Sequence, residues 1–131
     1  MSERKIPFVK MHGAGNDFVV IDCLAGEPVD DWQAFARFAL DRHLGVGGDQ
    51  LLLVQPSSQA DFFMGIRNSD GSPAEMCGNG IRAFFHYLRE AGHTRADEIR
   101  VETIARPPAW LEAQAAGFRD ALIDYGAPES M

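Results

Sequence analysis

The sequence predicts an α+β fold, in which β-strands and two helices build one domain. The chain has 131 residues, which is about the length of a single domain. Apolar residues make up 46% of it, which is enough to form a core. Segments rich in β-branched and aromatic residues are interspersed with two segments whose apolar residues recur at helical spacing. Strands and helices are therefore expected together.

The strands are predicted from short apolar runs that are bounded by glycine, proline or asparagine. We expect them over residues 6–10, 18–23, 50–54, 61–67 and 98–103. A glycine-containing loop joins the first two strands, and a glycine-rich stretch at residues 45–48 precedes the third. Residues 68–71, with the sequence NSDG, have the composition of a turn.

One helix is predicted before the third strand and one after the fourth. The first begins at Asp30 or Asp31, either of which can cap it, and ends at about residue 42. Its apolar face is expected to consist of Trp32, Phe35, Phe38 and Ala39. The second runs over residues 79–90 and stops before Gly92. Its apolar positions are Ile81, Phe84, Phe85 and Leu88.

The clearest sign of chemistry is Cys77, which stands at the start of the second predicted helix in the segment MCGNGIR (76–82). First-turn amides of a helix lack partners and carry partial positive charge, so they would lower the pKa of the thiol below about 8.5. The glycines let an anion such as a substrate carboxylate approach the same amides. A thiolate beside a carboxylate could take a proton from the adjoining carbon. The alternative is that Cys77 is a small buried apolar residue, the more common fate of a free cysteine.

Four sequence blocks, taken in order, resemble the diaminopimelate epimerase family. They are KMHGAGNDF (10–18) followed by VVID, DRHLGVGGDQ (41–50), NSDGS (68–72) and EMCGNG (75–80). The resemblance covers residues 6 to about 104. Four blocks with plausible gaps are far more specific than any one of them.

The resemblance implies a mostly antiparallel, curved sheet around a central helix. The family builds its enzyme from two similar domains with the active site between them, and this chain resembles the first, with the second expected to be absent. We expect residues 1–105 to form the N-terminal-like domain and residues 106–131 to be a divergent tail, readable as the end of the same domain. Within the tail, residues 109–118 would pass as a short helix, and residues 121–128 faintly resemble the family's next strand.

The resemblance also implies which residues act. The family interconverts LL- and meso-2,6-diaminopimelate with two cysteines that exchange the roles of base and acid, without pyridoxal phosphate or a metal. Cys77 is similar to the first of these cysteines, and no cofactor is expected. The matching substrate-binding positions are Asn16, Gln50, Asn68, Gly78 and Asn79. Amide side chains can bind the ammonium and carboxylate of a substrate without adding charge.

Structural roles remain open for three of these positions. Asn16 and Asn68 adjoin glycine-containing turns, where asparagine is common for conformational reasons alone. Gln50 can equally be a polar residue at the edge of a strand. The residues by themselves do not decide between a structural role and a substrate-binding role. The family resemblance favours substrate binding.

Several other reactive residues are expected to be structural. Cys23 alternates with apolar residues along a predicted strand, which indicates a buried face and a packing role. Asp17, Asp49 and Asp70 are expected to cap turns or accept hydrogen bonds from loop amides. The four histidines form no metal-ligand pattern in the sequence.

Composition narrows the range of partners. The net charge of −7, with no cluster of Lys or Arg to offset it, argues against nucleic acid and anionic membranes. No apolar run approaches the roughly 20 residues of a membrane span. The first residues, MSERK, are not followed by the apolar segment of a signal peptide, so we expect a cytoplasmic protein.

The function predicted from the sequence is that of diaminopimelate epimerase in lysine biosynthesis, with this chain carrying the first half-site. A small amino acid is the expected substrate, and a homodimer could bring two copies of Cys77 together. One alternative is a truncated, non-catalytic remnant or ligand-binding module of the same fold. Another is a related cofactor-independent amino-acid racemase.

Overall fold

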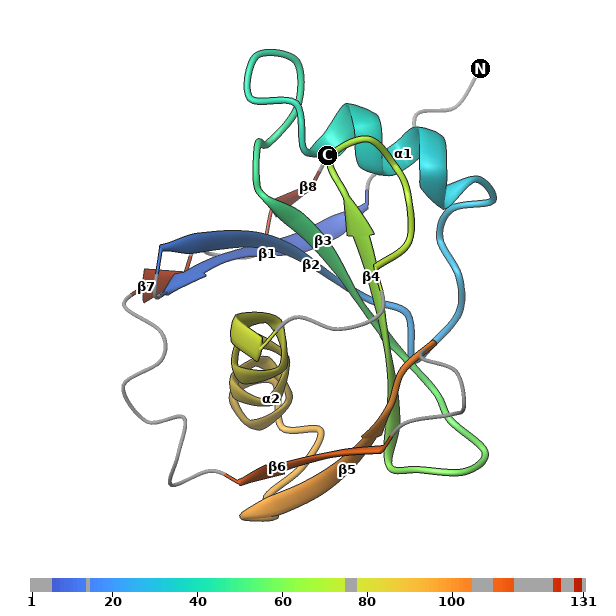
Figure 1. The fold of residues 1–131 in the computed structure, drawn as a ribbon, viewed down its shortest axis with the longest axis vertical. Helices are drawn as coiled ribbons and strands as arrows, with labels where there is room; N and C mark the ends of the chain where they lie inside the picture. Colours follow the sequence, from blue (N-terminus) through green and yellow to red (C-terminus); the bar gives the residue numbers. More distant parts are fainter. Residues whose placement is uncertain are drawn as a thin grey trace.

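The computed structural model describes residues 6–13, 15–74, 78–104, 110–114, 124–125 and 129–130. They form one sheet that curls around helix α2 (Gly78–Glu90), while helix α1 (Trp32–Ala39) packs on the outer face of the sheet (Figure 1). The strands are β1 (Pro7–Gly13), β2 (Asn16–Asp22), β3 (Gln50–Gln55), β4 (Phe62–Asn68), β5 (Glu98–Glu102), β6 (Trp110–Gln114), β7 (Asp124–Tyr125) and β8 (Glu129–Ser130).

The sheet has eight strands in the order β6-β5-β4-β3-β2-β1-β7, and β8 also pairs with β1. Neighbours run antiparallel except in two pairs, β2 with β3 and β4 with β5. Each parallel pair is joined by a crossover that contains a helix, because parallel strands cannot be joined by a tight turn. The predicted α+β fold, with a mostly antiparallel curved sheet around a central helix, is confirmed (Figure 1).

Strand alternation divides the core into two layers. The layer between the sheet and α2 includes Phe18, Val20, Leu52 and Val54. The layer between the sheet and α1 includes Val19, Ile21, Leu51 and Leu53. Strands β2 and β3 are therefore apolar on both faces, which places them at the centre of the molecule.

Helix α2 occupies the inside of the curved sheet because one face of it is fully apolar. The side chains of Ala83, Phe84, Phe85 and Leu88 are each no more than 1% exposed. The helix ends where predicted. Gly92 has a φ of 81°, and its N–H donates to the carbonyl of Arg89 over 3.2 Å. In the described part of the chain, no helix has the length and apolar character needed to cross a bilayer.

Helix α1 is capped by Asp31, whose carboxylate accepts a hydrogen bond from the N–H of Ala34 over 3.1 Å. It is shorter than predicted and ends at Ala39. Its buried residues are Ala36 and Ala39, and Phe38 is 50% exposed. The prediction that Phe38 lies on the apolar face was wrong, because the buried stripe follows positions 36, 39 and 40 and position 38 points away from it.

The end of the chain departs from the predicted helix. Residues 110–114 form strand β6, which pairs antiparallel with β5 from Glu102↔Trp110 to Glu98↔Gln114. The free edge of β5 offers a row of backbone partners, and these outweigh a weak local preference for helix. The predicted strand near residue 124 is present as β7, which pairs with β1. Residues 109 and 115–118 lie outside the described residues.

Candidate functional site

Three of the predicted substrate-binding residues lie at one end of the sheet. Asn16 begins β2, Gln50 begins β3 and Asn68 ends β4. Because β2 and β3 are parallel while β3 and β4 are antiparallel, these three positions share the same edge. Gln50 and Asn68 are direct cross-strand partners.

The same three side chains also share a face. Along each strand they stand two residues from Phe18, Leu52 and Ile66, which belong to the core layer packed against α2. Helix α2 starts at this end, and Asn79 is its second residue. The fold therefore brings four amide side chains, of Asn16, Gln50, Asn68 and Asn79, to the start of α2. We refer to them as the amide cluster.

The amide cluster is held by hydrogen bonds among half-buried side chains. Asn79 Nδ2 donates to Asn16 Oδ1 over 2.7 Å, and Gln50 Nε2 donates to Asn68 Oδ1 over 3.1 Å. Asn68 Nδ2 in turn donates to Ser72 Oγ over 3.2 Å. A primary amide offers two N–H donors and one carbonyl acceptor, so these bonds orient the side chains and still leave them capacity for a ligand.

Cys77 lies outside the described residues, so its thiol is not placed here and its role stays a prediction. Its covalent neighbour Gly78 is the first residue of α2 and is followed by Asn79. Chain connectivity alone thus brings Cys77 to the end of the helix at which the amide cluster gathers. The first-turn amides of a 13-residue helix supply positive potential at that end.

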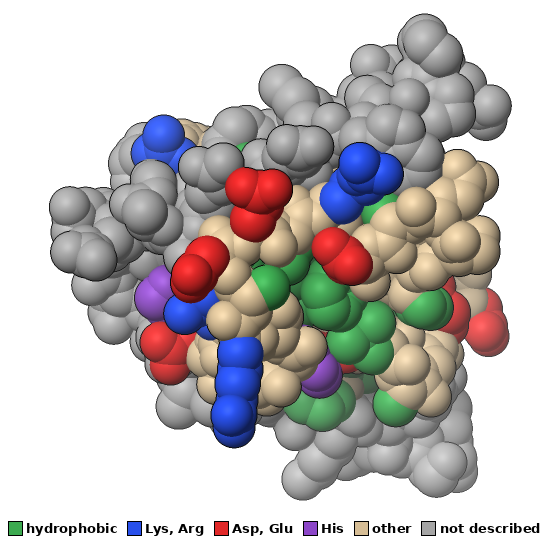
Figure 2. All heavy atoms as spheres, turned by 90° about the horizontal axis from the view of Figure 1, so that it is seen from below, with side chains coloured by type: hydrophobic (Ala, Val, Ile, Leu, Met, Phe, Trp, Pro, Cys, Tyr) green, Lys and Arg blue, Asp and Glu red, His purple; other side chains and the backbone are tan. Residues whose placement is uncertain are grey.

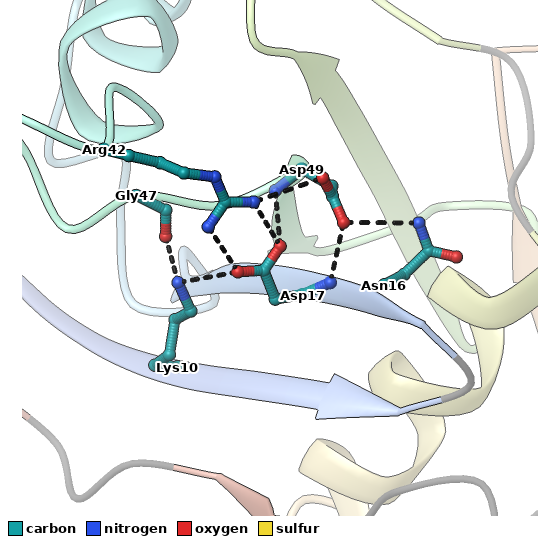
Figure 3. Close-up of polar contacts among 6 residues, drawn as sticks. All are labelled: Lys10, Asn16, Asp17, Arg42, Gly47 and Asp49. Carbon is teal, nitrogen blue, oxygen red and sulfur yellow. Dashed lines mark hydrogen bonds and ion pairs between the residues drawn. The ribbon is translucent and has the colours of Figure 1, made fainter.

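A second polar group lies beside the amide cluster on the other face of β2 (Figure 3). Asp17 Oδ1 accepts a hydrogen bond from the N–H of Asp49 over 2.9 Å, and Asp49 Oδ2 accepts one from the N–H of Asp17 over 3.0 Å. The two residues therefore cap each other across 32 positions of sequence. The prediction of loop-amide contacts is confirmed for Asp17, and for Asp70, which accepts from the N–H of Ser72 over 2.9 Å. The partner of Asp49 is instead an amide of strand β2.

Two cations complete this group. The Arg42 guanidinium donates two hydrogen bonds of 2.9 Å to the Asp17 carboxylate and a third, of 3.2 Å, to Asp49 Oδ1. Lys10 pairs with Asp17 over 3.1 Å and also donates to the carbonyl of Gly47. The Arg42 guanidinium, helped by Lys10, holds the pKa of Asp17 far below its usual range. We call Lys10, Asp17, Arg42 and Asp49 the ion network.

Sequence reasoning missed the ion network because its partners are distant in the chain. Arg42 and Asp17 are 25 residues apart, and nothing in their spacing predicts a contact. The available signal was indirect, since both lie in blocks that resemble one family. Arg42 and Asp17 are also the two residue types, arginine and a carboxylate, that form bidentate ion pairs.

Cys23 behaves as predicted for a packing residue. It is 2% exposed and belongs to the core layer beside α1, on the face of the sheet opposite the amide cluster. Burial, together with the nearby Glu27 and Asp22 carboxylates, raises the pKa of its thiol well above the ordinary value. A thiol in this position is a poor base and nucleophile.

A third polar group, also unforeseen, fastens the far end of β2 to the end of α2. Asp22 Oδ2 lies 2.6 Å from His93 Nε2 and accepts a hydrogen bond from the hydroxyl of Tyr87 over 2.8 Å. Burial opposes ionisation of Asp22, but hydrogen bonds from Leu24 N, Tyr87 and His93 outweigh it and lower its pKa. The group borders a cavity of about 320 Å³ between β1 and α2.

In the described part of the chain, no three His, Cys, Asp or Glu side chains gather in a way that could hold a metal ion.

Comparison with known sequences points to one family. The sequence model of diaminopimelate epimerase matches residues 8–107. The diaminopimelate epimerase of Moorella thermoacetica is 46% identical over 125 residues, which are 92% of this chain and 44% of that protein. That of Acidovorax ebreus is 52% identical over 126 residues, 95% of this chain and 42% of that protein. The chain thus spans less than half the length of these relatives.

Solved structures share the fold. A phenazine biosynthesis protein of the PhzF family from Bacillus anthracis has a TM-score of 0.66 at 22% identity, over 86% of this chain and 36% of that chain. A hydroxyproline epimerase from Agrobacterium vitis, with bound trans-4-OH-L-proline, has a TM-score of 0.64 at 20% identity, over 86% of this chain and 38% of that chain. At these identities the likeness establishes the fold alone.

Proposed function

The chain belongs to the diaminopimelate epimerase family, and from this premise we propose that it supplies one half of a site that epimerises 2,6-diaminopimelate at Cα. The reaction interconverts the LL and meso forms without a cofactor. In this proposal Cys77 is the acid or base of the half-site. The residues that bind the substrate are Asn16, Gln50, Asn68, Gly78 and Asn79.

The observation that supports this proposal most strongly is the amide cluster. Its four side chains come from β2, β3, β4 and α2, and they meet at the helix end to which Cys77 is covalently linked. Within the cluster two hydrogen bonds form two pairs, Asn79 with Asn16 and Gln50 with Asn68. Polar groups of this kind can fix both the carboxylate and the ammonium of an amino acid at one position.

The proton transfer needs one group on each face of Cα. The Cys77 thiolate takes the Cα proton, so that the Cα–H bond breaks and an S–H bond forms. A thiol on the opposite face then gives its proton to the carbanion and becomes a thiolate. Negative charge grows on the substrate carboxylate between these steps, and the first-turn amides of α2 together with the amide cluster can stabilise it.

A direct test is the uptake of deuterium at Cα of meso- and LL-diaminopimelate in D2O. We expect uptake with the wild-type chain and with the Cys23→Ala variant, which changes a cysteine far from the amide cluster. The Cys77→Ala variant should lose at least about 100-fold of the rate, because a positioned acid or base contributes 10²–10⁴-fold.

Two results would overturn the proposal. One is the absence of uptake from a folded, reduced chain, which would leave a ligand-binding module of the same fold as the better description. The other is uptake that persists in Cys77→Ala, which would assign the exchange to another group. Backbone NMR spectra of each variant check that the fold is intact.

We further propose that a second copy of the chain can supply the opposing thiol. A two-fold pairing uses the same surface on both copies and is the commonest way for a chain to assemble. If two copies build the site, the rate of uptake rises with the square of protein concentration when the dimer is scarce. A rate proportional to concentration over the same range would contradict this pairing.

A further inference from the structure

We propose that the ion network is a positioning unit for Asn16, which turns one amide N–H of Asn16 toward a carboxylate of the ligand. The identity of that ligand rests on the function proposed above. The network itself touches no reacting atom in this account. Its members act through the orientation of Asn16, so they are positioning residues.

The first step is the pair of contacts that Asn16 makes at its two ends. Its Oδ1 accepts from Asn79 Nδ2 over 2.7 Å. Its Nδ2 donates to Asp49 Oδ2 over 3.5 Å, as Figure 3 shows. The second hydrogen bond is long and individually weak. This contact matters because an ionised carboxylate can only accept hydrogen bonds, so the atom of Asn16 that faces Asp49 must be the donor Nδ2.

The Asp49 carboxylate favours one orientation of the amide. If the Asn16 amide rotated by half a turn, its Oδ1 would face this carboxylate, and two acceptors would oppose each other. A rotation of Asn79 together with Asn16 would keep the bond between these two residues, so the preference comes from Asp49 alone and is about that of one weak hydrogen bond.

The second step is the rigidity of Asp49. Its Oδ2 accepts from the N–H of Asp17 over 3.0 Å, and its Oδ1 accepts from Arg42 over 3.2 Å. Arg42 is fixed in turn by its two bonds to Asp17, which Lys10 also contacts. The four charges balance, and all of these bonds are made within the chain. The Asp49 carboxylate is therefore held by its own neighbours.

The third step concerns the hydrogen that remains. Asn16 Nδ2 carries two hydrogens, and its hydrogen bond to Asp49 uses one of them. Among the described residues the other has no acceptor, so it remains a donor for a ligand. A donor suits a carboxylate of a dicarboxylic amino acid and opposes an ammonium group. This N–H of Asn16 is therefore assigned to carboxylate recognition.

The test follows the side-chain amide of Asn16 in 15N-labelled full-length chain by NMR. In Asp49→Asn the obligatory acceptor is replaced by a group that can also donate. We expect the Asn16 amide protons to change shift and to exchange with solvent about fivefold faster, the ratio that loss of one weak hydrogen bond gives. Arg42→Gln should produce the same change, because it frees Asp49. Asp97→Asn, an identical substitution at a 93% exposed side chain, should leave the Asn16 signal unmoved.

Ligand chemistry supplies the second readout. Pimelate keeps the two carboxylates of diaminopimelate without its amino groups, and cadaverine keeps the amino groups without the carboxylates. Pimelate should shift the Asn16 amide signal and cadaverine should not, and Asp49→Asn should weaken the pimelate response about fivefold. An Asn16 signal that ignores Asp49→Asn and Arg42→Gln would overturn the inference, as would a response to cadaverine alone.

Deuterium uptake on the same samples separates this inference from the proposed function. A pimelate response at Asn16 that depends on Asp49, without any uptake, supports the positioning unit and overturns the epimerase half-site. Deuterium uptake together with an Asn16 signal that Asp49→Asn leaves unmoved supports the epimerase half-site and overturns the positioning unit.

Discussion

Asp17 and Asp49 each accept a hydrogen bond from the backbone N–H of the other, and this exchange joins the start of β2 to the loop before β3. Both strands begin with a residue of the amide cluster, Asn16 and Gln50. The two aspartates therefore set the relative position of two residues of the amide cluster. Arg42 and Lys10 strengthen the arrangement by keeping Asp17 ionised.

The ionisation of Asp17 predicts how stability depends on pH. In the folded chain Arg42 holds the pKa of Asp17 far below normal, whereas in the unfolded chain it titrates near 3.9. As the pH falls, the unfolded chain binds the proton first. The stabilisation is therefore complete above about pH 5 and is lost progressively as the pH drops through 3.9 toward the folded pKa.

Urea unfolding of wild type and Asp17→Asn checks this sign. The stability difference between the two should be largest at pH 7 and should shrink by on the order of 1 kcal/mol at pH 3. Asp97→Asn, with its exposed side chain, serves as the control and should differ little from wild type at either pH. An Asp17→Asn difference that is the same at pH 7 and pH 3 would contradict the role assigned to this ion pair.

The two cysteines should differ in reactivity. Cys23 is 2% exposed and burial raises the pKa of its thiol, so it should react with Ellman's reagent only as fast as the chain opens. We expect one fast thiol in the native wild-type chain, assigned to Cys77, and none in Cys77→Ala until a denaturant is added. Two fast thiols in the wild type, or a fast thiol in Cys77→Ala, would show that Cys23 is accessible.

Individual site residues could be predicted from the sequence where they lie in the blocks that resemble the family. Asn16, Gln50, Asn68 and Asn79 were predicted as candidate site residues in this way, and the structure brings them to one end of the sheet. The partners of the aspartates were not foreseen. Contacts such as Asp17 with Arg42, or Asp22 with His93 across 71 residues, depend on which strands become neighbours, and composition does not encode that.

Among the elements, the loop between α1 and β3 is built with little freedom. It carries Arg42 and Asp49, and Gly45 lies so close to the end of α1 that a Cβ there would sit 2.1 Å from the carbonyl oxygen of Phe38. A backbone atom cannot move aside as a flexible side chain can. Glycine at this position is therefore required by packing, and the position of the ion network depends on it.

The matched pair Gly45→Ala and Gly92→Ala tests this requirement. Gly92 has a φ of 81° but open space around its missing Cβ, so its substitution should cost about 1 kcal/mol of unfolding free energy. Gly45→Ala should cost about 3 kcal/mol, because the backbone must shift. Chemical denaturation measures both. Equal costs for the two variants would show that the loop yields easily.

The strands and helices were mostly predictable from periodicity, and the exceptions have physical causes. The residues 110–114 pair with β5 rather than forming a helix, because Trp110, Leu111 and Ala113 suit either structure and the edge of β5 decides between them. Phe38 is exposed because the stripe of α1 that packs on the sheet follows Ala36 and Ala39, and position 38 lies away from it. Both outcomes depend on tertiary packing, which outweighs local preference.

The whole molecule explains why four residues distant in sequence form one cluster. The crossover through α1 returns the chain to the end of the sheet where β2 began, and the antiparallel β4 brings it back to that end, where α2 then starts. On the face drawn in Figure 2, basic side chains of the described residues are scattered among acidic ones around a small hydrophobic group. Among the described residues of this face, therefore, the positive charges do not gather into one broad patch.

The most direct test of a diaminopimelate site at the start of α2 is a titration of 15N-labelled chain with meso-diaminopimelate, followed at the side-chain amides. We predict that the signals of Asn16, Gln50, Asn68 and Asn79 shift together with one dissociation constant, while those of Gln33, Gln55 and Gln59 stay in place. Shifts confined to residues around the cavity between β1 and α2, or no shift at the amide cluster at saturating ligand, would contradict the account.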